Sequence, residues 1–324
     1  MFSALDRFDW QPGQPHALHR EAQSFGESNC YADLWIEVLH ALGLEPRAML
    51  AHVLAVDVEG DQWTFFKPPH GELEFLYGVD VQELQLYDGV LGHVLEQLVL
   101  GRLVLAEVDA FHLPDTAGTT YRSSHAKTTI GIERADPDAR RLGYFHNAGY
   151  YELHGDDFSG VLEPALALPP YVEFVKLERV LRRPDHELRR LSRLLFARHL
   201  ARKPRENPIV AYQRGFGRHA QRWTSDLTRF HSYAFASLRQ CGSAYELGAR
   251  YLRWLLPESA DALAAADDLE AIAVASKSAL LCLARAAAHR KAADLTALSA
   301  VAPRWDAAFG RLEQCAGKLT GEAA

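Results

Sequence analysis

The hydrophobic positions of this chain follow mixed helical and strand spacing in the first half and helical spacing in the second. The clearest pattern begins after Gly26-Glu27-Ser28-Asn29, where apolar residues recur with the period of one helix face. These residues are Tyr31, Leu34, Trp35, Val38, Leu39 and Leu42. Ser28 or Asn29 can cap the N-terminus of this helix, and Gly43 with the following Pro46 closes its C-terminus. The pattern therefore predicts a helix with Cys30 in its first turn.

The rest of the first half predicts a sheet with short helices. Apolar or β-rich runs occupy residues 50–58, 63–67, 81–87, 102–109, 127–133 and 142–146. Helical spacing is found at residues 72–77 and 89–100. Because the helices come early and the strands late, we predict an α+β fold with a mainly antiparallel sheet.

The second half predicts an all-α domain. From about Val172 onward the spacing is helical, and alanine-rich stretches with regular Leu and Trp positions indicate a helical bundle. Leu168-Pro169-Pro170-Tyr171 interrupts any regular element before this change. We therefore expect an α+β domain over residues 1–170 and a helical domain over residues 171–324.

Charge supports the same division. The net charge of −7 combines −16 over residues 1–170 with +9 over residues 171–324. The basic excess lies in Lys176–Arg222, which has 14 Lys and Arg against 4 Asp and Glu. One interpretation is a solvated helix face that pairs with the acidic half. The other is a docking face for an acidic partner, with charge steering the encounter; the candidate docking residues are Arg189, Arg190 and Arg193.

Composition excludes several classes of function. The cysteines (Cys30, Cys241, Cys282 and Cys315) are widely spaced, which argues against a disulfide framework or a zinc site and favours the reducing cytoplasm. We expect no bound metal or cofactor. The N-terminus lacks the pattern of a signal peptide, and no run reaches the ~18 apolar residues of a membrane span. An acidic chain without a nucleic-acid motif is not expected to bind nucleic acid.

Three residues follow the chain order of a Cys-His-Asn site. Cys30 lies in a helix first turn, where the dipole favours a thiolate, although a small buried packing residue is the alternative. His125 ends a long loop and precedes the strand predicted from Lys127. Asn147 follows the next strand, at the end of a hairpin that we expect to bring it beside His125. The order Cys30, His125, Asn147 is that of papain-like enzymes.

Other residues are candidates to support this site. The backbone N–H of Cys30 and a side chain just upstream, Gln23 or Asn29, are the expected oxyanion donors. Glu107 and Asp109 share one face of a strand. They are candidates for a carboxylate pair or an anchor for a substrate amine, and the alternative is a structural role. Lys127 either holds an anionic substrate group or is an exposed strand lysine.

Several stretches resemble a family of bacterial proteins catalogued as a domain of unknown function. They are Glu-Ser-Asn-Cys-Tyr-Ala-Asp-Leu-Trp-Ile-Glu from Glu27, Glu-Gly-Asp-Gln-Trp-Thr-Phe-Phe-Lys from Glu59, and Tyr-Phe-His-Asn-Ala-Gly-Tyr-Tyr from Tyr144. More distantly, the first half is similar to the N-terminal domain of butirosin biosynthesis protein H, through Asn29-Cys30, the stretch from Gly101 to Asp109 with Leu113-Pro114, and His125.

This second resemblance implies a papain-like acyltransferase that takes an aminoacyl group from the phosphopantetheine thioester of an acidic carrier protein. It assigns Cys30 and His125 as the catalytic pair. Its third position is often Asp, which puts the role of Asn147 in doubt. The sequence leaves three alternatives open: transfer to an amine or another acceptor, hydrolysis by the same residues, and a non-catalytic binding module.

Overall fold

The computed structural model describes residues 1–21, 24–163, 169–223, 226–289 and 294–321. The chain divides into two units that are both discontinuous in sequence. Unit 1 comprises Met1–Arg20, Cys30–Pro46 and Pro68–Arg183, and unit 2 comprises Glu21–Asn29, Arg47–Lys67 and Pro184–Ala324. The sequence-based expectation was a single boundary at residue 170.

Unit 1 is built on one antiparallel sheet in the strand order β4-β9-β5-β6-β7-β8, with β1 paired to β6. Its strands are β1 (Phe2–Ser3), β4 (Asp80–Glu83), β5 (Leu103–Asp109), β6 (Lys127–Asp136), β7 (Arg141–His146), β8 (Gly149–His154) and β9 (Val172–Lys176). Its helices are α1 (Ala17–Arg20), α2 (Cys30–Ala41), α3 (His70–Tyr77), α4 (Val90–Val99) and α5 (Asp156–Leu162), with 3-10 turns η2 (Ala110–His112) and η3 (Pro114–Thr116).

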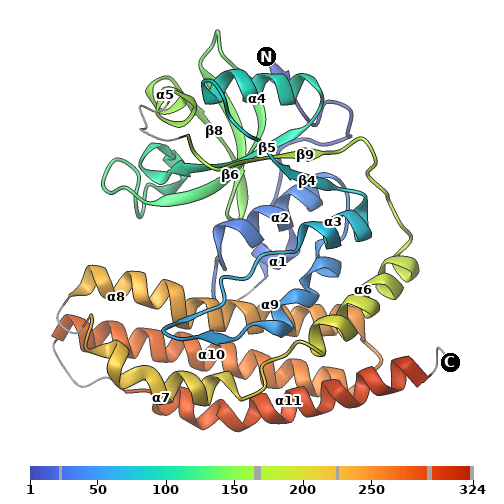
Figure 1. The fold of residues 1–324 in the computed structure, drawn as a ribbon, viewed down its shortest axis with the longest axis vertical. Coiled ribbons are helices and arrows are strands. Elements are labelled where there is room, and N and C mark those ends of the chain that lie inside the picture. The colour runs from blue at the N-terminus through green and yellow to red at the C-terminus, as the bar shows by residue number, and fades with distance from the viewer. Residues whose placement is uncertain (22–23, 164–168, 224–225, 290–293, 322–324) are drawn as a thin grey trace. The chain divides into compact units, whose positions relative to one another are not determined.

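Helix α2 covers one face of this sheet, while α4 and α5 lie on the other (Figure 1). Gly131 of β6 makes the close approach of α2 possible. A Cβ there would lie 3.3 Å from Leu105 of β5 and 3.4 Å from Leu34 of α2. The apolar face read from the sequence is the buried one: Leu34, Trp35 and Val38 are fully buried.

Unit 2 is mainly helical. It contains most of the 3-10 segment η1 (Pro46–Ala55), the small hairpin of β2 (Val58–Glu59) and β3 (Gln62–Trp63), and a bundle of long helices. The helices are α6 (Asp185–Leu200), α7 (Pro208–Ala220), α8 (Leu227–Ala234), the π-helical turn η4 (Phe235–Arg239), α9 (Gln240–Leu255), α10 (Ala260–His289) and α11 (Thr296–Gly321).

Within the described chain, α10 is the one helix long and apolar enough to cross a membrane. It packs between α9 and α11, and its buried positions include Leu269, Ile272 and Leu283. A core helix of a bundle meets the same length and composition criteria.

The observed fold is α+β with an antiparallel sheet and a helical C-terminal part, as the sequence predicted at that level. Two local expectations were wrong. The β-rich run over 50–58 is the 3-10 segment η1 followed by β2. The chain from Val172 does not begin a helical region, because Val172–Lys176 is strand β9 between β4 and β5. A buried carboxylate, Glu173, sits in that strand and obscures its apolar alternation.

Candidate active site

A histidine–aspartate pair lies where β5 ends and β6 begins. The register places Asp109 opposite Lys127, so the residues just before β6 lie beside the Asp109 carboxylate. His125 Nδ1 lies 2.5 Å from Asp109 Oδ2. The other oxygen, Oδ1, accepts backbone N–H groups of Phe111 at 3.0 Å and Ala126 at 3.2 Å. Three donors therefore fix the orientation of Asp109.

These contacts keep Asp109 ionised. Partial burial alone would raise the pKa of Asp109, but the hydrogen bonds from His125, Phe111 and Ala126 outweigh it and hold the pKa below its ordinary value. An aspartate that accepts from Nδ1–H leaves Nε2 of His125 as the basic nitrogen. The His125 side chain is 75% exposed, so Nε2 is accessible to a substrate. This is the tautomer that general acid–base catalysis requires.

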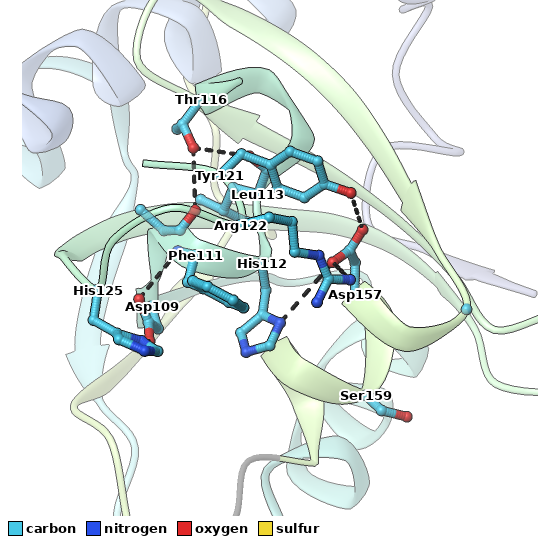
Figure 2. A network of polar contacts seen from close by, with 12 residues as sticks. Asp109, Phe111, His112, Leu113, Thr116, Tyr121, Arg122, His125, Asp157 and Ser159 are labelled. Carbon is cyan, nitrogen blue, oxygen red and sulfur yellow. Dashed lines mark hydrogen bonds and ion pairs between the residues drawn. The ribbon is translucent and has the colours of Figure 1, made fainter. Parts of the chain in front are cut away.

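An aromatic ring restricts the imidazole further. The rings of Phe111 and His125 are stacked, with centroids 4.7 Å apart and planes inclined by 16°. Phe111 belongs to the loop that links β5 to β6, which carries both the stacking ring and the histidine (Figure 2).

Asp157, at the start of α5, ties this loop to that helix. Its carboxylate accepts from Tyr121 Oη at 2.9 Å and from Arg122 at 2.5 Å (Figure 2). Arg122 has a left-handed backbone with φ of 52° and donates its N–H to Phe111 O. His112 Nδ1 is 3.9 Å from Asp157, and its ring covers Gly160, where a Cβ would lie 2.2 Å from the ring. The loop is therefore an ordered platform for His125.

A second carboxylate anchors the same loop to the β7 strand. Asp115 accepts from Tyr144 Oη at 2.5 Å and lies 2.6 Å from His146 Nδ1. The other nitrogen of His146 lies 2.8 Å from Thr128 Oγ1. His146 is 1% exposed, so its role is structural, and it does not share the exposed site of His125.

Cys30 is the first residue of α2 and is partly exposed. The contact of Leu34 with Gly131 places α2 on the face of the sheet that holds Leu105. Alternation along β5 puts the side chains of Glu107 and Asp109 on that same face. Cys30 thus begins the helix that covers the face carrying the Asp109–His125 pair, with the positive end of the helix dipole at its thiol.

Asn147 does not occupy the position expected for it. Gly131 pairs with Phe145, so continuing the ladder brings Asn147 opposite Thr129, four residues or about 13 Å short of His125. Asn147 lies in the tight turn between β7 and β8 with φ of 45°, a conformation that asparagine tolerates well. Strand β5, rather than β7, runs beside the start of β6, and Asp109 therefore holds His125.

Of the two upstream oxyanion candidates, the structure describes only Asn29. Gln23 lies outside the described residues. The Asn29 side chain is 1% exposed and its amide donates to Phe66 O at 3.1 Å and to Gln240 Oε1 at 3.3 Å. The donor of the prediction that remains is the backbone N–H of Cys30, at the start of α2.

Glu107 and Lys127 form an ion pair across the ladder, with Lys127 Nζ 2.6 Å from Glu107 Oε1. Lys127 is 71% exposed, so this pair contributes little to stability. Both residues line a cavity of about 660 Å³. The cavity is lined by Glu107, Val108, Asp109, His112, His125, Ala126, Lys127, Ser159, Gly160, Val161, Glu163 and Pro170. The Asp109–His125 pair therefore opens onto a space large enough for a small ligand.

Sequence reasoning missed a polar network beside Cys30. Tyr31 Oη donates to Glu173 Oε2 at 2.8 Å and lies 2.7 Å from His70 Nε2. Tyr171 Oη donates to the other oxygen of Glu173 at 2.9 Å. Burial, together with the charge of Glu173, raises the pKa of Tyr31. The network joins the first turn of α2 to β9. The sequence signal for such a network is a single acidic residue within a short apolar run, here Glu173 within residues 172–175.

A second missed network fixes the middle of α2. His19 lies 3.2 Å from Asp33 and 2.5 Å from Glu37, and all three side chains are at most 6% exposed. Burial alone would lower the pKa of His19, but its hydrogen bonds to Asp33 and Glu37 and their charges raise it to about 9. The sequence signal is the i, i+4 spacing of two acidic residues on an otherwise apolar helix.

The predicted docking arginines lie on α6 of unit 2. Arg189 is engaged: it donates to Asp185 at 2.6 Å and lies 4.7 Å from the ring centroid of Trp254. Arg190 and Arg193 are exposed, and no ion pair holds either of them within the described residues. Those residues also contain no cluster of His, Cys, Asp and Glu suited to a metal ion.

The remaining cysteines differ from Cys30. Cys241 and Cys315 are buried, and burial raises the pKa of the Cys241 thiol to about 12. Cys282 is exposed on α10. Cys30 is therefore the one of the four that combines partial exposure with a helix N-terminus.

Comparison with known proteins gives a family. Residues 14–177 match the DUF1839 N-terminal domain, and residues 185–314 match the DUF1839 C-terminal domain. No curated protein matches the chain. The junction between the two matches, residues 178–184, coincides with the passage from unit 1 to the long helices of unit 2. Because the two domains together account for most of its length, the chain belongs to the DUF1839 family.

Proposed function

We propose that this protein is a cysteine-dependent acyltransferase with a papain-like catalytic unit, in which Cys30 is the nucleophile and His125 the acid–base catalyst. Asp109 takes the orienting role that the sequence assigned to Asn147. The observation that carries the proposal is the Asp109–His125 pair, 2.5 Å apart, on the face of the sheet covered by the Cys30 helix.

The reaction has two balanced half-steps. The Cys30 thiolate attacks the thioester carbonyl, the bond from that carbon to the donor sulfur breaks, and protonated His125 gives its Nε2 proton to the departing thiolate. An amine then attacks the acyl-Cys30 carbonyl. The new C–N bond forms, His125 Nε2 accepts the amine proton, and the bond from the carbonyl carbon to the Cys30 sulfur breaks, so that Cys30 leaves as a thiolate beside protonated His125. Asp109 holds the imidazole in orientation throughout.

The cavity beside His125 supports the acceptor half of this proposal. It opens onto the pair and is lined by the carboxylates of Glu107 and Glu163 together with Lys127. Glu163 accepts a hydrogen bond from Ser159 Oγ at 2.6 Å. A small polar acceptor with an amino group suits such a lining, since carboxylates attract the cationic form of an amine outside the catalytic step.

The donor follows from the resemblance to carrier-dependent acyltransferases: an aminoacyl group on the phosphopantetheine of an acidic carrier protein. The exposed Arg190 and Arg193 on α6 support a docking role, since exposed cations accelerate encounter with an anionic surface. Arg189 is better assigned to holding Asp185 and Trp254.

The test is a discharge assay with a carrier protein charged with a radiolabelled amino acid. Acyl transfer predicts label on the protein that is removed by hydroxylamine, and label on an added amine in the presence of wild-type chain. Release of free amino acid with every amine tried would instead show that the same residues catalyse hydrolysis. Absence of both labelled protein and accelerated discharge would leave only a binding module.

A further inference from the structure

A second imidazole lines the cavity onto which the Asp109–His125 pair opens. His112 belongs to the 3-10 turn η2 of the same loop, and its ring lines the cavity together with that of His125. We propose that His112 is a second acid–base group, which removes the first proton from the ammonium group of an acceptor amine. The inference rests on the proposed function insofar as an amine attacks the acyl-enzyme.

Figure 2 shows the ring of Phe111 between the two imidazoles. Phe111 stacks on His125 at a centroid distance of 4.7 Å, and it meets the ring of His112 at 5.1 Å with planes inclined by 77°. Each imidazole has a carboxylate on its Nδ1 side. Asp109 lies 2.5 Å from His125 Nδ1, and Asp157 lies 3.9 Å from His112 Nδ1. All five residues belong to unit 1, so one loop presents two histidines to one cavity.

The packing around His112 leaves one edge of its ring open. A Cβ on Gly160 of α5 would lie 2.2 Å from Nδ1 and 2.4 Å from Cε1, so the helix covers this side of the ring. Nδ1 is buried and makes no hydrogen bond within the described residues, because 3.9 Å to Asp157 is too long for one. The side chain is nevertheless 24% exposed, and its exposed edge carries Nε2.

The charge of Asp157 selects the basic nitrogen. An anion near Nδ1 favours the tautomer with its hydrogen on that atom, which leaves Nε2 of His112 free to accept a proton. Imidazole is also the side chain that gains and loses a proton most readily near neutral pH. His112 can therefore accept a proton from a ligand in the cavity and release it to water.

An amine acceptor has two protons to lose. The carboxylate of Glu163 lines the cavity and makes no ion pair within the described residues, so it favours the ammonium form of a bound amine. An ammonium nitrogen has no lone pair and cannot attack a carbonyl carbon. It must first give up one proton, and it gives up a second when its bond to the acyl carbon forms.

The two histidines divide these protons. His112 Nε2 accepts the first, and the neutral amine then attacks the acyl-Cys30 carbonyl. His125 Nε2 accepts the second as the carbon–sulfur bond breaks and Cys30 leaves as a thiolate. Over both half-reactions a thioester and an ammonium ion become an amide, a thiol and one proton, which His112 passes to water.

The experiment separates the two protons by changing the acceptor. Ethylamine is an ammonium ion at pH 7.5, whereas methoxyamine is uncharged at that pH and needs to lose only the second proton. Wild type and His112→Gln are acylated in the full chain with an aminoacyl thioester. Rapid quenching and mass spectrometry then follow the decay of the acyl-enzyme with each amine. Glutamine keeps the polarity of the side chain but is not a base.

We expect His112→Gln to slow the reaction with ethylamine at least about 10-fold and to leave the reaction with methoxyamine within about twofold of wild type. The rate of acylation should be unchanged, because His125 alone serves that half-reaction, and it also reports whether the loop keeps its position. His154→Gln, at an exposed histidine of β8 outside the cavity lining, should equal wild type with both amines.

His112→Ala provides a second variant if glutamine disturbs the loop. Added 2-methylimidazole, a base too hindered to be an effective nucleophile, should restore the ethylamine rate in His112→Ala and leave the wild-type rate unchanged. A purely structural role of His112 predicts no such rescue.

An unchanged ethylamine rate in His112→Gln would overturn the inference. So would an equal loss with both amines that 2-methylimidazole does not restore in His112→Ala, or a wild-type acyl-enzyme that reacts with neither amine. Failure of the proposed function is a different result, since it would appear as absence of acyl-enzyme in the wild-type chain.

Discussion

Asp109 and His125 face each other at 2.5 Å because β5 and β6 pair in a register that sets Asp109 opposite Lys127. The pair is thus a product of sheet register: a shift of one residue would turn Asp109 to the opposite face. Phe111 completes the arrangement by stacking on the imidazole.

Replacing Asp109 with Asn should leave the fold intact and lower the rate of acyl transfer about 10³–10⁴-fold, because the amide no longer selects the tautomer with a basic Nε2. Single-turnover acylation measures this loss. Asn147→Gly is the control, since glycine accepts the φ of 45° in the β7–β8 turn. A large loss in Asn147→Gly together with an unaffected Asp109→Asn would restore the original assignment.

Replacing Asp157 with Ala should release the loop that carries Phe111 and His125. The neighbouring Asp156→Ala removes an exposed charge from the same first turn of α5, so the two variants share the loss of a helix-dipole interaction. Hydrogen exchange over residues 119–124 should accelerate in Asp157→Ala only, because Tyr121 and Arg122 lose their acceptor. Equal exchange in both variants would show that the loop is held by other contacts.

Stability should fall on the alkaline side through His19. Its folded-state pKa of about 9 exceeds the ordinary 6.5, so the folded state binds the proton more tightly than the unfolded chain. The stabilisation is therefore complete below about pH 6.5 and is lost as the pH rises through 9; its upper limit is about 3 kcal/mol.

Urea titrations at pH 6 and pH 9.5 measure this difference in the free energy of unfolding. His19→Gln should be less stable than wild type at pH 6 and should lose less stability on going to pH 9.5. The exposed His154 supplies the control variant, His154→Gln, which should keep the wild-type pH dependence. A wild-type chain that is equally stable at both pH values would contradict the assignment of a buried imidazolium.

Charge reversal on α6 tests the docking surface. Arg190→Glu combined with Arg193→Glu should raise the KM for charged carrier protein at low salt, and the difference from wild type should shrink as ionic strength screens the field. Acylation by a small synthetic thioester should be unchanged, since that donor needs no protein surface. An unchanged KM for carrier protein at low salt would remove these residues from the interface.

The sequence predicted the Cys30 helix well because its apolar positions follow a single period, and all of them are buried. The same reasoning placed Asn147 incorrectly because it assumed that β6 and β7 are equally long. In the structure β6 extends several residues beyond the end of β7, and β5 is its neighbour there. Non-local strand pairing determines which strand lies beside the N-terminal end of β6, and the hydrophobic periodicity of the sequence does not encode this pairing.

The discontinuity of the two units also lay beyond the sequence pattern. Residues 47–67 belong to the helical unit although they precede most of the sheet in the chain. The apolar run within these residues is compatible with either a strand or a buried helical segment. In the structure it forms the 3-10 segment η1. The partners of buried charged residues such as Glu246 also gave no signal, because the backbone groups that this carboxylate binds lie more than 200 residues away in the sequence.

Peptide mass spectrometry of the chain after a brief incubation with an aminoacyl thioester tests directly whether Cys30 is the nucleophile. We expect an aminoacyl adduct on the Cys30 peptide, none on the Cys282 peptide, and loss of the adduct in His125→Ala. An adduct that forms equally on Cys30 and Cys282, or none on Cys30 in the wild-type chain, would contradict this expectation.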